Sequence, residues 1–441
     1  MANSQKYKNK KIAIYGLGKS GFSAAKRLTQ MGAEVFCWDD SSTVRKKIKR
    51  FNLKLIKFWL IKNYYIDYIV ISPGIDINKC KIKNFLKKNI NKIITDIDIF
   101  FEVNRNLPTI SITGTNGKST TCKIIEKILK TAGYKVHLLG NIGNPVLSLK
   151  KYSKNSIFIL EVSSYQLQYS KFFRSKHAAI LNISPDHLDR HKTINEYIKA
   201  KIRIFYAQQS SDYSYINTNS KYYKFIKNKI KRKKIKSKIV YVNNNKYKNF
   251  INKIKNRSFL SKGNIENFSF ACEIVKNLNI SSKIIVKSLK SFKNLPHRQE
   301  IVFSNKYMTC VNDSKATSFD ASMQSLSIYN KIYLIIGGVP KIKDQFKLQN
   351  FYKKIVKVYI IGKKPLFFKK KISKNIPYII SHNLRNAIKD IYSDIKKSKK
   401  YNNTVLLSPS GASFDQFKNF EERGEVFKKL ALKKLNKISY V

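Results

Sequence analysis

The sequence predicts an α/β protein that is divided into three successive domains. Its 441 residues allow about three domains, at roughly 150 residues each. Short apolar segments alternate with helical segments along most of the chain, a pattern typical of parallel α/β units. Two glycine-rich turns also stand between a strand and a helix, where nucleotide phosphates commonly bind. We expect the domains to span residues 1–107, 108–297 and 298–441.

The first glycine-rich turn lies near the N-terminus. Residues 11–40 alternate strand, turn, helix and strand, and Asp39 and Asp40 end the second strand. The turn has the spacing G-x-G-x-x-G, formed by Gly16, Gly18 and Gly21. This is a Rossmann-type arrangement, and a nicotinamide dehydrogenase is one function that it indicates. The apolar strand at 68–75 ends in a second loop that contains Ser72 and Gly74.

The second glycine-rich turn follows a new strand that begins near Pro108. It reads T-G-T-N-G-K-S-T and contains Gly114, Thr115, Asn116, Gly117, Lys118, Ser119 and Thr120. It departs from the ordinary P-loop because Ile112 stands where that pattern has glycine. Small residues still let backbone N–H groups approach an anion, while Lys118 suits phosphates and Ser119 suits magnesium. The structural alternative is a glycine turn that merely caps a helix.

Further polar residues follow the next apolar segments. Glu161 ends the run "SIFIL", so it should face the same side of a parallel sheet as the phosphate loop and suit magnesium. The segment "NISPDHLDRH" holds Asp186, His187, Asp189 and His191, whose spacing matches no strong zinc pattern. We expect His187 to be a neighbour of an oxygen-rich site or a ligand of a second metal, with turn and cap roles as the alternative.

Three further segments say less about function. Residues 312–322 and 408–424 read as polar loops that follow buried strands. The Lys-rich section 220–260 has weak periodicity, and we expect loops with one or two edge strands there.

The charge of the chain is extreme, with 88 Lys+Arg against 26 Asp+Glu and a net charge of +62. Such a field attracts nucleic acid, anionic lipid or anionic small substrates, so a nucleic-acid-binding ATPase is an alternative function. However, the excess Lys comes with many Asn, Ile, Tyr and Phe, which A/T-rich codons also favour. The basic runs form no compact motif interleaved with aromatic residues. We expect no nucleic-acid partner.

The cysteines and apolar runs bear on the compartment. Five scattered cysteines without a C-x-x-C pair predict reduced thiols in a cytoplasmic protein. No apolar run approaches the roughly 20 residues that a spanning helix needs, so we expect no membrane partner.

Taken together, these stretches resemble the Mur ligase family of peptidoglycan synthesis, from Lys11 to about Leu432. The resemblance is carried by "TGTNGKST", "LEVSSYQL", "PDHLDRH", "NLPHRQE", "NDSKATS" and "LLSPSGASFDQFKNFEERG". It implies a Rossmann-like N-terminal domain that binds the UDP of the substrate, a central P-loop-type ATPase domain, and a Rossmann-like C-terminal domain. The first glycine loop would then hold UDP rather than a hydride cofactor.

The resemblance also implies the reaction. A carboxylate of UDP-N-acetylmuramoyl-L-alanine would attack the γ-phosphate of ATP, and the amine of D-glutamate would attack the resulting acyl phosphate. "FDQFKNFEERG" favours the D-glutamate-adding branch over sister enzymes that add another amino acid and over folate polyglutamylating relatives. We expect a monomer whose partners are these small molecules.

Site residues follow from the resemblance, position by position. For the UDP-substrate they are Gly18, Lys19, Ser20, Asp40, Ser41, Ser72, Gly74, Asn141, Ser163 and Gln166. For ATP they are the phosphate loop with Asn267, Arg298, Asp313 and Lys315. For two Mg²⁺ ions they are Ser119, Glu161, His187 and Lys201 as a carbamate. For D-glutamate they are Thr317, Lys341, Ser413, Phe414 and Phe420.

Three of these residues, Lys118, His187 and Lys201, would be catalytic. The chain departs from the family at Gly263, where a histidine is usual. Lys343 lies close enough to Lys341 for the two assignments to exchange.

Overall fold

The computed structural model describes residues 4–61, 65–149, 152–153, 155–259, 261–340, 348–372 and 375–438. The chain forms two compact units, one of residues 1–255 with 265–290 and one of residues 256–264 with 291–441. Among the described residues, no helix is both long and apolar enough to cross a bilayer.

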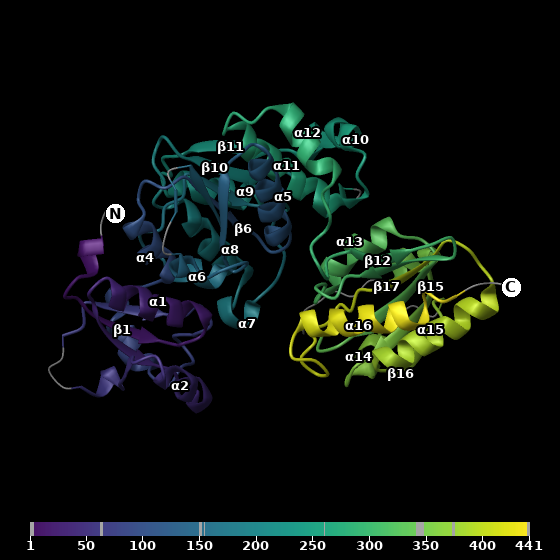
Figure 1. The fold of residues 1–441 in the computed structure, drawn as a ribbon, viewed down its shortest axis with the longest axis horizontal. Coiled ribbons are helices and arrows are strands. Elements are labelled where there is room, and N and C mark those ends of the chain that lie inside the picture. The colour runs from purple at the N-terminus through teal and green to yellow at the C-terminus, as the bar shows by residue number, and fades with distance from the viewer. Residues whose placement is uncertain are drawn as a thin grey trace. The chain divides into compact units, whose positions relative to one another are not determined.

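The first sheet of the N-terminal unit has five parallel strands in the order β3-β2-β1-β4-β5. The strands are β1 (Lys11–Tyr15), β2 (Glu34–Trp38), β3 (Lys54–Leu55), β4 (Tyr68–Ile71) and β5 (Ile93–Ile94). The helices are α1 (Lys19–Gln30), α2 (Ser42–Lys49), α3 (Lys83–Lys88) and α4 (Asp96–Val103), with short 3-10 turns η1 (Ser4–Tyr7), η2 (Phe58–Leu60) and η3 (Ile90–Lys92). Figure 1 draws β1, α1 and α2 in purple.

Both faces of this first sheet are covered. Along β1, Ile12 and Ile14 join one hydrophobic cluster, whereas Ala13 and Tyr15 join another. Alternate side chains of a strand point to opposite faces, so a strand that is apolar at every position needs cover on both sides. The run of apolar residues in β1 therefore fits the observed Rossmann-type layering.

The second sheet of the same unit has six parallel strands in the order β11-β10-β9-β6-β8-β7. They are β6 (Thr109–Thr113), β7 (Lys135–Gly140), β8 (Ser156–Glu161), β9 (His177–Ile180), β10 (Tyr213–Asn217) and β11 (Lys238–Val242). The helices are α5 (Lys118–Thr131), α6 (Ser164–Gln168), α7 (Leu188–His191), α8 (Ile194–Ile202), α9 (Tyr223–Arg232), α10 (Lys248–Ile254), α11 (Lys262–Lys276) and α12 (Ser282–Lys290). The 3-10 turns are η4 (Val146–Ser148), η5 (Arg203–Phe205) and η6 (Asn244–Tyr247), whereas η7 (Arg257–Phe259) and the first three residues of α11 belong to the C-terminal unit.

Contacts around α4 join these two sheets into one unit. The turn η4 packs on α1 and α4. From α4, Asp98 Oδ1 accepts hydrogen bonds from the Ser170 hydroxyl at 2.7 Å and from three successive backbone N–H groups, those of Lys171, Phe172 and Phe173. A carboxylate that accepts this many hydrogen bonds fixes the position of the segment that donates them.

The C-terminal unit contains a six-stranded sheet in the order β12-β13-β17-β14-β15-β16, in which only the β12–β13 pair is antiparallel. Its strands are β12 (Glu300–Ser304), β13 (Met308–Asn312), β14 (Ile332–Gly337), β15 (Ile355–Ile361), β16 (Tyr378–His382) and β17 (Asn403–Leu407). Its helices are α13 (Phe319–Ile328), α14 (Pro365–Lys369), α15 (Leu384–Ser398) and α16 (Phe420–Lys434), with the 3-10 turn η8 (Leu348–Lys354).

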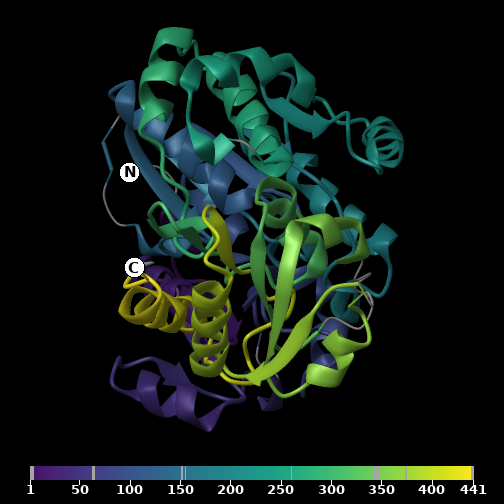
Figure 2. The ribbon, with the colours of Figure 1, turned by 90° about the vertical axis from the view of Figure 1, so that its right-hand side faces the viewer.

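Helices cover both faces of this third sheet. From β14, Tyr333 and Ile335 pack in a cluster with residues of α15 and α16, whereas Leu334 and Ile336 pack in a second cluster that includes residues of α13 and α14. In Figures 1 and 2, α15 and α16 lie side by side on the first of these faces. The arrangement is again Rossmann-like, and the predicted α/β class with parallel sheets is confirmed.

One structural expectation was wrong in part. The section 220–260 does supply an edge strand, β11, but most of the rest is helical rather than looped, in α9, η6 and α10. The buried residues of α9 are Ile226 and Ile230, which lie four positions apart. Lysines occupy many of the other positions, so the helical periodicity of the apolar residues is hard to recognise in the sequence. The domain boundaries at 107/108 and 297/298 stay predictions.

Candidate functional site

The phosphate-loop candidate joins the end of β6 to the start of α5. Gly117 is the N-cap of α5 and has a left-handed φ of +83°. A Cβ on Gly117 would lie 2.0 Å from Asn267 Oδ1 of α11, so glycine is required both by the backbone and by the approach of that side chain. Lys118 Nζ donates to the carbonyl oxygens of Gly114 and Thr115, each at 2.8 Å. The helix N-terminus and the lysine together suit a polyphosphate.

A carboxylate lies directly beside this loop. Glu161, the last residue of β8, is 2% exposed, and its Oε2 accepts a hydrogen bond from Ser119 Oγ at 2.6 Å. Its other oxygen accepts from Asn141 Nδ2 at 2.8 Å. The predicted position of Glu161 beside the phosphate loop is therefore confirmed. A hydroxyl and a carboxylate at this separation are the oxygen donors that Mg²⁺ prefers.

A buried lysine approaches the same loop from α8. Lys201 is 1% exposed, and its Nζ donates to Gly114 O at 2.9 Å and to Thr113 Oγ1 at 3.3 Å. Burial, and next the nearby charge of Lys118, lower the pKa of Lys201 well below its ordinary value. A neutral amine is the form that reacts with CO₂, so this lysine is suited to become the carbamate that the resemblance implies.

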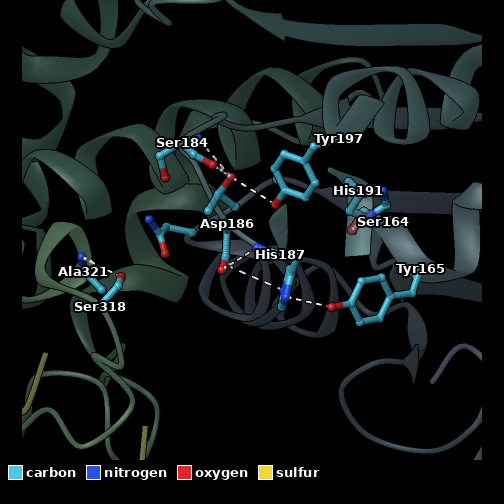
Figure 3. A network of polar contacts seen from close by, with 12 residues as sticks. Ser164, Tyr165, Ser184, Asp186, His187, His191, Tyr197, Ser318 and Ala321 are labelled. Carbon is cyan, nitrogen blue, oxygen red and sulfur yellow. Dashed lines mark hydrogen bonds and ion pairs between the residues drawn. The ribbon is translucent and has the colours of Figure 1, made fainter. Parts of the chain in front are cut away.

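His187, the first histidine of the "PDHLDRH" segment, lies near Tyr197 of α8. His187 is the N-cap of α7, and its Nδ1 is 2.9 Å from the Tyr165 hydroxyl (Figure 3). The ring of Tyr197 lies 6.4 Å from the His187 ring and 4.6 Å from Lys201 Nζ. Tyr197, which the sequence analysis did not single out, therefore lies near both predicted ligands of a second metal. Its hydroxyl reaches Thr115 Oγ1 of the phosphate loop at 3.2 Å.

The zinc interpretation of this segment finds no support in the geometry. Within the residues that the structure describes, no three His, Cys, Asp or Glu side chains converge to hold a metal. His191 Nε2 pairs instead with the Ser164 hydroxyl at 3.0 Å, and burial lowers the pKa of His191 to about 4. A neutral histidine in a hydrogen bond is a structural residue here.

The residues predicted for the UDP-substrate follow three neighbouring strands of the first sheet. Gly18 caps α1, Ser72 Oγ donates to Gly16 O at 2.7 Å, and Asp40 Oδ2 accepts from the Tyr15 hydroxyl at 2.6 Å. Lys19, Ser20, Ser41 and Gly74 lie in the same three turns after β1, β2 and β4. Carboxyl ends of adjacent parallel strands form the usual nucleotide site of such a sheet.

Asp39 is closer to the glycine loop than the predicted Asp40. Its Oδ2 accepts from the Leu17 N–H at 2.7 Å, and its Oδ1 accepts from the Ser41 N–H at 2.9 Å. Asp39 therefore braces the first glycine turn, a role that spacing alone could not separate from that of its neighbour.

Two further residues predicted for the UDP-substrate, Ser163 and Gln166, lie at the start of α6, and one of them reaches a second buried carboxylate. Ser163 caps α6 by accepting from the Gln166 N–H at 3.2 Å. Gln166 Nε2 in turn reaches Asp96 Oδ2 at 3.5 Å. Burial raises the pKa of Asp96 to about 6, against the lowering effect of hydrogen bonds from Gln166, Ile97 and Ser20. Two predicted substrate residues, Ser20 and Gln166, therefore converge on Asp96.

The residues predicted for ATP binding are divided between the two compact units. Asn267 is buried in the N-terminal unit, where its Oδ1 accepts from Thr121 Oγ1 at 3.2 Å. Arg298, Asp313 and Lys315 belong to the C-terminal unit. Asp313 accepts from the hydroxyls of Ser325 and Ser408 and from the Gln299 N–H, and burial raises its pKa to about 6.

The described residues predicted for D-glutamate lie after β13 (Thr317) and after β17 (Ser413, Phe414 and Phe420, the first residue of α16). Lys315 Nζ is 3.7 Å from the centre of the Phe420 ring, and the Thr317 N–H donates to Lys315 O at 2.9 Å. Ser413 is buried, whereas Phe414 is 75% exposed. Lys341 and Lys343 lie outside the described residues.

Arg423 of α16 connects these two segments and was missed by the sequence analysis. Its guanidinium is 1% exposed and donates to the hydroxyl and carbonyl oxygens of Ser314 and to Gly411 O, at 2.8 to 3.0 Å. Burial lowers the pKa of Arg423 to about 10. A buried charge needs such partners, and its motif, "FEERG", gave no sign of them.

Comparison with known proteins relates this geometry to a family. The family described as Mur ligase middle domain matches residues 112–288, and the one described as Mur ligase MurD-like, N-terminal domain matches residues 10–94. The UDP-N-acetylmuramoylalanine--D-glutamate ligase of Rickettsia prowazekii is 36% identical, over 96% of this chain and 98% of that protein. The ligase of the same name from Rhizobium johnstonii is 32% identical, over 95% of this chain and 94% of that protein.

Solved structures share the fold. The MurF ligase of Thermotoga maritima in complex with ADP has a TM-score of 0.57 at 14% identity, covering 98% of this chain and 97% of that one. The UDP-N-acetylmuramate-alanine ligase MurC of the same organism has a TM-score of 0.54 at 14% identity, covering 96% of this chain and 99% of that one.

Proposed function

Because this chain belongs to the Mur ligase family, we propose that it joins D-glutamate to UDP-N-acetylmuramoyl-L-alanine in an ATP-dependent step of peptidoglycan synthesis. The observation that carries the proposal is similarity along nearly the whole chain to ligases of that name. The phosphate loop with Lys118, Ser119 and Glu161 supports the use of ATP.

The proposed reaction balances in two steps. A carboxylate oxygen of the alanyl residue attacks the γ-phosphorus of ATP, and the bond from that phosphorus to the β,γ-bridging oxygen breaks to release ADP. The amine of D-glutamate then attacks the acyl carbon, loses a proton, and expels inorganic phosphate as the C–O bond breaks. A free carboxylate is a poor electrophile, so the phosphoryl group serves to supply a leaving group.

Positive charge must lie between the two anionic reactants. Lys118 would contribute one such charge at the phosphates. Magnesium, when bound, would neutralise the triphosphate and the attacking carboxylate. Ser119 and Glu161 would hold one ion, and His187 with the carbamate of Lys201 would hold a second. The oxygen donors at Glu161 and the lowered pKa of Lys201 both support this donor set.

The remaining assignments are proposals of the same kind. The turns after β1, β2 and β4 would hold UDP, with Asn141, Ser163 and Gln166 toward the muramoyl-alanine end. Asn267, Arg298, Asp313 and Lys315 would contact ATP. Thr317, Lys341, Ser413, Phe414 and Phe420 would contact D-glutamate. We further propose a cytoplasmic monomer with three domains, consistent with five free cysteine thiols.

Phosphate release from ATP tests the proposal directly. The assay contains UDP-N-acetylmuramoyl-L-alanine and one amino acid chosen from D-glutamate, L-glutamate, L-alanine and a diamino acid. We expect release only with D-glutamate, together with formation of the amide product. Equal release with every amino acid, or release only with another one, would contradict it.

A further inference from the structure

Four asparagines stand at the carboxyl ends of four neighbouring strands in the second sheet. Asn116 follows β6, Asn182 follows β9, Asn217 ends β10, and Asn244 follows β11. The sheet order β11-β10-β9-β6 makes these positions successive along one edge. The four residues therefore form a row that ends in the phosphate loop.

Glu266 of α11 binds three of these amides at once. Its Oε1 accepts from Asn182 Nδ2, and its Oε2 accepts from Asn217 Nδ2 at 2.7 Å. Desolvation raises the pKa of Glu266, while hydrogen bonds from Asn182, Asn217 and Asn244 lower it. A carboxylate has no donor group, so its two oxygens can accept hydrogen bonds from several amide NH₂ groups. None of these amides has to rotate to present its oxygen instead.

Asn182 carries this contact to the phosphate loop. The N–H of Asn116 donates to Asn182 Oδ1 at 2.8 Å, and Asn182 Nδ2 donates to Asn116 O at 3.2 Å. The N–H of Thr115 also donates to the backbone oxygen of Asn182 at 2.9 Å. Glu266 and Asn116 O both accept from Nδ2 of Asn182, so its Oδ1 is directed at the loop N–H and the carboxylate contributes to the orientation of the amide.

We propose that Glu266 is a positioning residue for nucleotide binding, which fixes the Asn182 amide and thereby holds the phosphate loop at Asn116. The next residue on the same helix, Asn267, approaches the loop at Gly117 and accepts from Thr121 Oγ1 of α5. The helix α11 therefore braces the loop through two successive side chains. This inference rests on the proposed ATP-dependent function.

The test compares variants of the full chain by calorimetry with a magnesium-loaded, non-hydrolysable ATP analogue, and by steady-state kinetics. The variants are Glu266→Ala, Glu266→Gln, Asn182→Ala and the Glu266→Ala/Asn182→Ala double variant. The matched control is Glu273→Ala, which removes a buried carboxylate of the same helix whose partner is Lys246 at 2.7 Å. Thermal unfolding of each variant measures the purely structural cost.

We expect Glu266→Ala to weaken analogue binding by about tenfold and to raise the KM for ATP similarly, as expected for a lost charge-assisted hydrogen bond. The KM for the UDP-substrate should stay within about twofold, because those contacts are untouched. The analogue affinity of Glu266→Gln should lie between those of the wild type and Glu266→Ala, because an amide offers only one acceptor oxygen to three donors. The double variant should bind no more weakly than Asn182→Ala, because Glu266 acts through Asn182.

Unchanged analogue affinity in Glu266→Ala would overturn the inference, as would additive losses in the double variant. If Glu266→Ala does not fold, Glu266→Gln and Asn182→Ala decide by the same criteria. Failure of the proposed function is distinguishable: the wild-type protein would then bind the analogue but make no amide with D-glutamate.

Discussion

Lys118 and Lys201 donate to the same carbonyl oxygen, that of Gly114, at 2.8 and 2.9 Å. Two ammonium groups on one acceptor repel each other, and Lys201 is also deeply buried. Burial and then the charge of Lys118 lower the pKa of Lys201, so the fold favours its neutral amine. The neutral amine is the form that can react with CO₂, which supports the proposed carbamate.

The first prediction concerns this amine. Lys201→Ala should lower the rate of D-glutamate ligation by at least about 100-fold, because the anionic carbamate that would hold the second Mg²⁺ is lost. A short carboxylic acid in the buffer should restore part of the rate by supplying the missing carboxylate-like oxygens. The matched control is Lys199→Ala, which removes an exposed lysine of the same helix that pairs with Glu196. Full activity of Lys201→Ala would refute the carbamate role.

The second prediction concerns Glu161 and magnesium. Glu161→Gln should raise the Mg²⁺ concentration for half-maximal rate by about tenfold, since a neutral amide is a weaker ligand than a carboxylate. Titration of the ligation rate with Mg²⁺ measures the effect. Glu126→Gln on α5 is the control, because Glu126 pairs with Lys123 and Lys130 on the helix surface. An identical Mg²⁺ dependence in Glu161→Gln and the wild type would argue against the proposed ligand.

The third prediction compares two glycines of left-handed conformation at the ends of α5. Gly117→Ala places a Cβ 2.0 Å from Asn267 Oδ1, whereas Gly133→Ala, at φ +88°, meets nothing within 4 Å. Both variants should lose about 1 kcal/mol of stability from backbone strain. Only Gly117→Ala should also lose nucleotide affinity, by about tenfold or more, as measured by calorimetry. Equal affinities in the two variants would show that Asn267 does not constrain the loop.

The fourth prediction concerns pH and Asp96. Burial raises the pKa of Asp96 from 3.8 to about 6, so the folded protein binds this proton more tightly than the unfolded chain does. Its contribution to stability is therefore present below pH 3.8 and is lost as the pH rises through about 6. That shift corresponds to about 3 kcal/mol.

Asp96→Asn should remove this loss, because its side chain stays neutral. Urea unfolding midpoints measured from pH 4 to pH 8 should show that the stability of the variant increases relative to that of the wild type as the pH rises. At pH 4 the two proteins serve as their own control, since both carry a neutral group there. A constant difference between them across this range would contradict the raised pKa.

Much of the nucleotide loop was predictable from sequence because its chemistry is local. Glycines at a strand–helix junction, followed by Lys118 and Ser119, specify a phosphate-binding turn within a few residues. Glu161 was also predictable, since the end of a parallel strand fixes which edge of the sheet a side chain occupies.

Other parts depend on tertiary contacts that no local pattern reports. Among 88 Lys and Arg residues, only the fold buries Lys201 against Gly114, and spacing alone could not single it out. Tyr197 and Arg423 act through partners far away in the sequence. The helix α9 was missed because its two buried residues, Ile226 and Ile230, stand among lysines.

The most direct test of the central claim follows an oxygen atom. UDP-N-acetylmuramoyl-L-alanine labelled with ¹⁸O in its alanyl carboxylate is incubated with the protein, ATP, Mg²⁺ and D-glutamate, and the released phosphate is examined by mass spectrometry. If the carboxylate is activated as an acyl phosphate, each phosphate carries one oxygen from that carboxylate. Phosphate without ¹⁸O, formed while the amide product accumulates, would contradict the account.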